Sequence, residues 1–180
     1  MDLVLSPLGS IPFLMILNKR IFFMSRPSLA KAKKAFKEVY DNVGKTVSGV
    51  GRKIGGKVDY NINKITIGRF ENACAIRLSY VLNQTGYKVP KILGETVSGQ
   101  AGNWYIYRIT ALIPHLIKQF GKPDYVFNNP TQQKLKNHKG ILVFEVSFRN
   151  ATGHATIWDG VNCSDQCYFV QSKKAYLWEL

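Results

Sequence analysis

Hydrophobic positions in much of the chain recur every three or four residues, which is the spacing of amphipathic helices. This periodicity predicts helices over residues 28–41, 72–85 and 110–120. Ser28 and Asn72 suit the N-cap positions of the first two, because their side-chain oxygens can accept a free backbone N–H. Glycines at positions 86 and 121 follow the second and third helices, where glycine commonly ends a helix.

Shorter apolar runs in the rest of the chain have the length and composition of strands. They predict strands over residues 104–109, 140–148 and 153–158, and an edge strand over 176–178. Helices come first and strands later, with a hairpin near the end of the chain. The pattern therefore predicts an α+β fold in which N-terminal helices pack on a mainly antiparallel sheet.

Residues 44–58 interrupt this pattern with five glycines and four basic residues. Gly44-Lys45-Thr46 is similar to part of a phosphate-binding loop, but that motif requires a further glycine where the chain has Val39. It also requires a preceding strand, whereas a helix is predicted there. We therefore reject a phosphate loop and expect a mobile loop near the active site.

The hairpin around Asp159-Gly160 brings a histidine and an acidic residue together. This dipeptide is typical of a two-residue type I′ turn, and counting outward from it places His154 opposite Asp165. Opposed residues have Cβ atoms about 4.5–5.5 Å apart on the same face of the sheet. The Asp165 carboxylate can then accept the Nδ1–H of His154, whereas Asp159 lies at the turn with opposite parity.

Cys74 is the candidate nucleophile. With Asn72 as N-cap, Cys74 is the second residue of its helix, where free N–H groups and the helix dipole favour a thiolate. The backbone N–H groups near Cys74 can also hold an oxyanion. The alternative is that Cys74 is a small buried hydrophobic residue. The predicted pair of His154 and Asp165 favours a Cys–His–Asp triad.

Cys163 and Cys167 are close neighbours on the predicted hairpin. They would lie about 13 Å apart in an extended strand, too far for a disulfide. A disulfide forms only if the chain turns sharply around residues 164–166, in which case it clamps the loop that presents Asp165. A reduced pair is the alternative. We expect no metal and no cofactor, because two thiols without a nearby histidine pair do not supply four ligands.

The other two histidines are weaker catalytic candidates. His115 lies in an apolar helix and is expected to be structural, and His138 lies in a basic loop and is expected to be solvated. Neither has an acidic partner at a predictable position. Trp104, Arg77 and the glycine-rich segment are candidate neighbours of the cleft that the sequence alone does not place.

Composition and charge set the class of protein. Hydrophobic residues make up 46% and charged residues 20%, as in a globular domain, and residues 24–180 fit one catalytic domain. Residues 1–23 form an extension, which we interpret either as an N-terminus assigned upstream of the native start or as a disordered segment. Its positive charge follows the apolar stretch, unlike a signal peptide, and the stretch is too short to insert stably in a membrane. The net charge of +14 attracts anionic partners such as nucleic acid, lipid, peptidoglycan or an acidic inhibitor.

Three motifs and three shorter segments resemble the fourth family of type VI secretion amidase effectors. The motifs are Asn72–Asn83, Gly153–Trp158 and Cys163–Cys167, and the segments are Thr96–Gly99, Tyr105–Arg108 and Gly121–Asp124. The resemblance runs from about Met24 to near the C-terminus. It implies a papain-like fold of the cell-wall-peptidase type.

The resemblance also implies a function and a set of roles. Family members cut the γ-D-glutamyl–meso-diaminopimelate amide of peptidoglycan stem peptides. The nucleophile falls on Cys74, the general base and acid on His154, the residue that orients it on Asp165, and the disulfide on Cys163 and Cys167. We therefore expect a toxin made in the cytoplasm, delivered by the type VI secretion components to the target-cell periplasm, and neutralised by a cognate periplasmic immunity protein.

Two other functions are compatible with parts of the sequence. Transglutaminases and acyltransferases also use a cysteine, a histidine and an aspartate, but transfer the acyl group to an amine. A basic nucleic-acid-binding protein would account for the charge, but the sequence has no recognisable nucleic-acid motif, so we expect no nucleic-acid partner.

Overall fold

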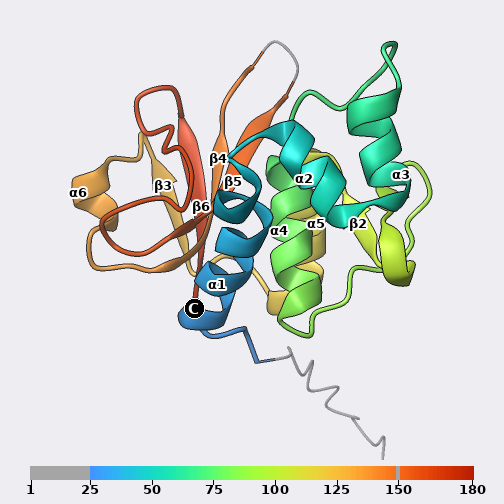
Figure 1. Ribbon diagram of the computed structural model, residues 1–180. Coiled ribbons are helices and arrows are strands. Elements are labelled where there is room, and N and C mark those ends of the chain that lie inside the picture. Colours follow the sequence, from blue (N-terminus) through green and yellow to red (C-terminus); the bar gives the residue numbers. More distant parts are fainter. Residues whose placement is uncertain (1–24, 149–150) are drawn as a thin grey trace, which may run out of the picture.

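A four-stranded antiparallel sheet separates most of the helices from the long C-terminal loop, residues 159–173, in the computed structural model (Figure 1). The structure describes residues 25–148 and 151–180, so the predicted extension over residues 1–23 lies outside the described residues. The helices are α1 (Leu29–Val39), α2 (Val47–Ile54), α3 (Gly56–Asp59), α4 (Cys74–Gln84), α5 (Ile109–Phe120) and α6 (Gln132–Leu135). Short turns η1 (Asp41–Val43), η2 (Tyr60–Lys64) and η3 (Gln100–Gly102) connect some of them.

The strands form two antiparallel sheets. They are β1 (Thr96–Ser98), β2 (Trp104–Ile106), β3 (Tyr125–Asn128), β4 (Gly140–Glu145), β5 (Gly153–Trp158) and β6 (Lys174–Glu179). The large sheet has the order β3-β6-β4-β5, and β1 and β2 form a small hairpin. The predicted α+β class is thus confirmed. The prediction that the last strand lies at an edge is wrong, because β3, which the sequence reading missed, pairs with its outer side.

Both faces of the large sheet are buried, which accounts for the uninterrupted apolar run of β4. Ile141 and Val143 pack in the core formed with the helices, whereas Leu142 and Phe144 pack on the opposite face. The C-terminal loop and α6 cover that second face, with Leu135 among its buried residues. The strand ends at Glu145, three residues earlier than predicted, and the chain then leaves the sheet.

Helix α4 lies at the centre of the helical layer, beside α1 (Figure 1). Every residue from 74 to 83 is buried, so the polar residues among them need partners inside the protein. Ser79 Oγ donates to the Ala75 carbonyl at 2.9 Å and accepts from the Ile106 N–H at 3.0 Å. The Asn83 side chain donates to the Trp104 carbonyl and accepts the Val89 N–H, each at 2.9 Å. The contacts of Ser79 and Asn83 with Ile106 and Trp104 hold α4 against β2.

Most of the glycine-rich segment is helical, so the prediction of a loop over residues 44–58 is wrong except at residues 44–46 and Gly55. Thr46 caps α2 by accepting the Gly49 N–H at 3.0 Å. A Cβ on Gly49 would lie 2.1 Å from the Val43 carbonyl oxygen, and one on Gly51 2.6 Å from an Asn63 side-chain nitrogen. These two glycines therefore permit close packing, and that packing outweighs their low helix propensity.

The turn after β5 differs from the prediction. The Asp159 carboxylate accepts the N–H groups of Val161 and Asn162 at 3.0 and 2.7 Å, which stabilises a longer loop than a type I′ turn. Trp158 consequently pairs with Cys163, two residues beyond the predicted partner. The predicted register is therefore wrong, and the contact between His154 and Asp165 has a different origin, described below.

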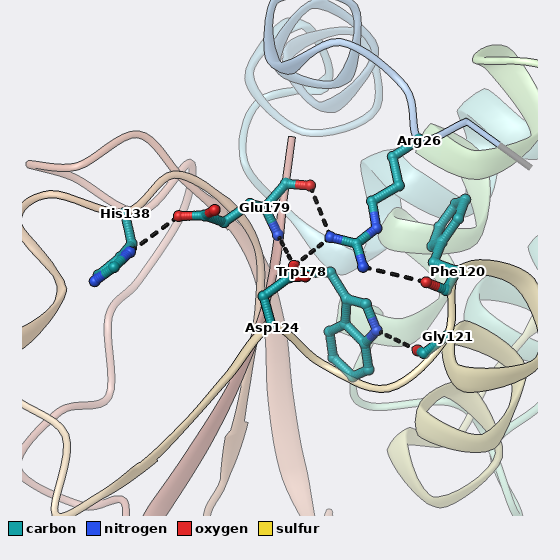
Figure 2. A network of polar contacts seen from close by, with 7 residues as sticks. All are labelled: Arg26, Phe120, Gly121, Asp124, His138, Trp178 and Glu179. Atoms are coloured by element: carbon teal, nitrogen blue, oxygen red, sulfur yellow. Dashed lines mark hydrogen bonds and ion pairs between the residues drawn. The ribbon is translucent and has the colours of Figure 1, made fainter. Parts of the chain in front are cut away.

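A polar network joins the segment before α1 to the end of α5 and to β6 (Figure 2). The Arg26 guanidinium forms an ion pair with Asp124 and donates to the Phe120 and Glu179 carbonyls, each at 3.1 Å. The Glu179 N–H donates to Asp124 at 2.7 Å. Burial raises the pKa of Asp124, but the hydrogen bonds from Arg26 and the Glu179 N–H outweigh burial, so the pKa is lowered. His138, predicted to be solvated, instead pairs with the Glu179 carboxylate at 2.9 Å.

Candidate active site

Cys74 is the first residue of α4. The Ala73 carbonyl accepts the Arg77 N–H at 2.7 Å, which is the first bond of the helix, so Ala73 is the N-cap. The prediction of Asn72 as N-cap is therefore wrong by one residue, and Asn72 lines the adjacent cavities instead. The Cys74 side chain is still in the first turn, where backbone N–H groups have no carbonyl partner within the helix.

His154 lies between the Cys74 thiol and the Asp165 carboxylate. Its Nε2 is 3.0 Å from Asp165 Oδ1, and the Cys74 thiol, which donates to the Gly153 carbonyl at 3.9 Å, is close enough to the imidazole that each group shifts the pKa of the other. Nε2 therefore carries the proton shared with Asp165, and Nδ1 is the nitrogen left for the thiol. The predicted bond from Nδ1 to Asp165 is wrong, because opposite edges of the ring face α4 and the C-terminal loop.

Arg77 holds the second oxygen of the Asp165 carboxylate. Its Nη2 donates to Asp165 Oδ2 at 2.7 Å, and the two side chains are only 9% and 2% exposed. The guanidinium also lies over the ring of Tyr40, 4.7 Å from its centroid, and near the ring of Phe36. Asp165 thus has one buried cation and one imidazole as partners, which offsets the cost of burying its charge.

The electrostatics favour a thiolate and an imidazolium. Burial raises the pKa of the Cys74 thiol, but the His154 hydrogen bond and the positive charges of His154 and Arg77 outweigh it, so the pKa is lowered. Burial lowers the pKa of His154, but its bonds to Asp165 and Cys74 raise it to about 9. The Asp165 pKa is lowered in turn, because its partners outweigh burial. Such an ion pair is an activated nucleophile with a proton donor beside it.

A disulfide closes the loop that presents Asp165. Cys163 and Cys167 are bonded, with Cα atoms 5.5 Å apart. The Ser164 N–H still donates to the Ile157 carbonyl at 2.8 Å, so the chain leaves the strand pairing directly after this residue. The sharp turn within the disulfide loop then returns Asp165 to His154, which is why the predicted partner is right although the predicted register is wrong.

Two cavities adjoin at Cys74 and together form a cleft. The first has a volume of about 260 Å³ and includes Lys45, Arg77 and Tyr168 in its lining. The second has a volume of about 330 Å³ and extends past Arg108. Asn72, Cys74 and Phe148 belong to both linings. A substrate in the cleft would pass over the thiol with one part in each cavity.

Sequence reasoning missed most of the residues around the three central side chains. Arg77 was a candidate neighbour that could not be placed, although it follows Cys74 by three residues and so shares its helix face. Tyr168, whose ring centroid lies 4.8 Å from that of His154, follows Cys167 directly, and no local sequence signal indicates its place in the site. Trp104 lines neither of the two cavities that include Cys74.

The remaining histidine and possible metal sites lie apart from this chemistry. His115 is buried in α5, as predicted, and burial followed by the charge of Lys118 lowers its pKa. Within residues 25–148 and 151–180, no group of three or more His, Cys, Asp or Glu side chains is arranged to hold a metal ion. Among the helices of these same residues, none has the length and hydrophobicity to cross a bilayer.

Comparison with known proteins identifies a family. The family model for type VI secretion system (T6SS), amidase effector protein 4, matches residues 70–178 of the chain. That range includes Cys74, His154, Asp165 and both disulfide cysteines. No curated protein sequence matches the chain.

Solved structures of similar proteins cover most of the chain. The effector Tae4 from Salmonella typhimurium, solved with the immunity protein Tai4 from Enterobacter cloacae, is 41% identical, with a TM-score of 0.76 over 86% of this chain and 99% of that one. Tae4 in the Tae4–Tai4 complex from Enterobacter cloacae is 38% identical, with a TM-score of 0.78 over 87% and 99%. The effector Tae4 from Enterobacter cloacae is 37% identical, with a TM-score of 0.76 over 87% and 98%.

Proposed function

Because the chain belongs to the family of type VI secretion system amidase effector protein 4, and is therefore an amidase that acts on peptidoglycan, we propose which bond it cuts and how. The bond is the γ-D-glutamyl–meso-diaminopimelate amide of the stem peptide, and Cys74 is the nucleophile. The observation that carries the proposal is the buried group of Cys74, His154 and Asp165, of which Cys74 and His154 line the cleft.

The first half of the reaction forms a covalent intermediate. The Cys74 thiolate attacks the carbonyl carbon, and the backbone N–H groups of the first turn of α4 bind the resulting oxyanion. His154 then donates its Nδ1 proton to the diaminopimelate nitrogen, which leaves as the amine. A glutamyl thioester on Cys74 remains.

The second half releases the product. Neutral His154 takes a proton from a water molecule, whose oxygen attacks the thioester, and Cys74 leaves as the thiolate. Asp165 keeps the ring oriented through both halves, and Arg77 keeps Asp165 ionised and in place. Asp165 and Arg77 are positioning residues, since neither contacts the reacting atoms.

The biological setting follows from family membership. We infer that the chain is made in the cytoplasm of the producing cell and that the type VI secretion components deliver it to the periplasm of a target cell. We further infer that a cognate immunity protein binds over the cleft, since the similar effectors from Salmonella typhimurium and Enterobacter cloacae were solved with Tai4.

The test is product analysis of purified peptidoglycan. Digestion with the wild-type protein should give new fragments that end in a free γ-carboxyl of D-glutamate and a free amine of diaminopimelate, each identified by mass spectrometry. Cys74→Ala should give none while keeping the wild-type melting temperature, and His138→Asn, outside the cleft, should keep full activity. Cleavage at another bond would refute the bond, activity of Cys74→Ala would refute the nucleophile, and an amine adduct in place of water would indicate a transferase.

A further inference from the structure

Each half of the cleft contains one exposed cation, Lys45 with a single long contact to Asp41 and Arg108 with no ion pair among the described residues. Lys45 lines the cavity on one side of Cys74, and Arg108 lines the cavity on the other. We propose that Lys45 and Arg108 bind the two free carboxylates that flank the scissile amide and so determine which stem peptides are cut. This inference rests on the proposed function, because it assigns the substrate groups that the same site recognises.

Lys45 is held at the cleft by its backbone, while its ammonium group is free to bind a ligand. The residue has a left-handed φ of 57°, directly after Gly44 with a φ of 79°, and its N–H donates to the Tyr40 carbonyl at 2.9 Å. A left-handed conformation is unfavourable for a lysine and persists where the surrounding structure imposes it. The side chain is 67% exposed, and its contact with Asp41 is long, at 3.7 Å. A carboxylate in the cavity can replace that contact.

Arg77, the other basic side chain in the lining of this cavity besides the catalytic His154, is not available to a substrate. Its guanidinium is hydrogen-bonded to Asp165 and lies over the Tyr40 ring, and its side chain is only 9% exposed. Lys45 is therefore the cation on this side of Cys74 that a ligand can reach.

Arg108 is oriented by aromatic rings. Its guanidinium lies 5.0 Å from the centroid of the Tyr107 ring, which stacks on Phe70 at 4.9 Å. A guanidinium held over a ring keeps its N–H donors available in the plane, a geometry suited to a carboxylate. Arg108 is exposed and forms no ion pair with any carboxylate of the described residues.

The proposed substrate has a matching arrangement of charge. On the acyl side of the scissile amide, D-glutamate is linked through its γ-carboxyl and so keeps a free α-carboxylate. On the amine side, diaminopimelate keeps a free carboxylate at its distal centre. One carboxylate on each side of the reacting carbon corresponds to one cation on each side of Cys74.

The test combines substrate and protein variants. Four synthetic L-alanyl-γ-D-glutamyl-diaminopimelyl-D-alaninamide peptides, in which the proximal carboxyl of diaminopimelate is bonded to the D-alaninamide, carry free carboxylates, an amide at glutamate, an amide at the distal centre of diaminopimelate, or both. Lys45→Met and Arg108→Met remove each charge but keep an unbranched side chain. Lys53→Met removes an exposed charge of α2 that lines none of the cavities described here and serves as the control.

Each cleft variant should lower kcat/KM on the dicarboxylate peptide about 10- to 100-fold, which is typical for loss of a charge-assisted hydrogen bond. The loss should disappear when the carboxylate that the cation binds is amidated, and the two variants should respond to different amides. Equal losses on all four peptides, or a loss no greater than that of Lys53→Met, would overturn the assignment of that cation.

Binding separates this inference from the proposed reaction. Dissociation constants of the four peptides are measured by calorimetry with Cys74→Ala, alone and combined with Lys45→Met or Arg108→Met. The same selective loss should appear as weaker binding without any turnover. If binding shows it but the wild type does not cut the peptide, the proposed bond fails and the carboxylate sites stand. If cleavage occurs and neither measurement depends on the amides, the carboxylate sites fail alone.

Discussion

Asp165→Asn should be far more damaging than a nearly isosteric change suggests. In the wild type, one carboxylate oxygen faces His154 Nε2 at 3.0 Å and the other faces Arg77 Nη2 at 2.7 Å, and both nitrogens are donors. An amide has one accepting oxygen and one donating nitrogen, so it can satisfy only one of them. The charged and buried guanidinium takes the oxygen, because an unpaired buried charge costs more than an unpaired neutral group.

The consequence falls on the histidine. With the amide NH₂ turned toward it, Nε2 must accept a hydrogen bond, so the proton of the neutral ring moves to Nδ1. Nδ1 then cannot take the thiol proton, and the pKa of Cys74 returns toward the ordinary 9.0. A thiol with that pKa is about 1% ionised at pH 7, so kcat/KM should fall about 100-fold.

Removing the competing donor should restore part of the activity. In Asp165→Asn combined with Arg77→Met, the amide oxygen is free to turn toward His154, and we expect kcat/KM about 10-fold above that of Asp165→Asn alone. Arg77→Met by itself is the control for lost packing against Tyr40. The rate of thiol alkylation as a function of pH reports the pKa of Cys74 in each variant, and melting temperatures report folding.

Two results would refute this reasoning. If Asp165→Asn keeps kcat/KM within about threefold of the wild type, the amide satisfies both donors or the orientation of His154 matters little. If the double variant is less active than Asp165→Asn although it is folded, Arg77 does not compete for the amide oxygen.

Three further predictions concern pH, the disulfide and the distant polar network. The pKa of His154 is raised from 6.5 to about 9, so kcat/KM should fall as the pH rises through about 9, which a pH–rate profile measures. The stability gained from protonation of His154 is complete below pH 6.5 and should be lost as the pH rises through about 9, which melting temperatures measure. Replacing Cys163 and Cys167 by serine should lower the free energy of unfolding by about 2 kcal/mol, which denaturant unfolding measures. The same change should lower kcat/KM, because the loop no longer holds Asp165 in place. An unchanged kcat/KM would contradict the positioning role of the disulfide. Arg26→Ala should cost about 1 kcal/mol in denaturant unfolding and leave kcat/KM unchanged, and a large kinetic effect would show that the network reaches the cleft.

The parts of the fold that follow from local rules were predictable from sequence. The helix after Ser28 begins where its cap indicates, since the serine side chain accepts the Lys31 N–H. Gly86 ends the second predicted helix with a φ of 96°, as a glycine in that position should. The contact between His154 and Asp165 was also predicted, although from a hairpin register that is wrong, and Cys74 was predicted from its place in the first turn of its helix.

The parts that depend on tertiary contacts were not predictable. Gly49 and Gly51 lie inside the helix over Val47–Ile54 because neighbouring segments pack too closely there for a Cβ. The sequence shows the glycines but not the neighbours that require them, so it indicated a loop. The hairpin register depends on which N–H groups the Asp159 side chain accepts, and a dipeptide rule does not include that choice. Arg77 could be placed in the site only once the position of the C-terminal loop was known.

The polar network of Arg26, Asp124 and Glu179 lies at the end of the large sheet away from His154. Glu179 pairs with Gly140 on β4 and His154 with Phe144, so the two lie four residues apart along the strand, about 13 Å. The chain end at Leu180, whose N–H still donates to the Lys139 carbonyl, therefore points away from the cleft end of the sheet. A fluorescent reporter joined after Leu180 should leave the approach of a cell-wall strand to Cys74 unobstructed, so that a fused and an untagged enzyme can be compared on intact sacculi.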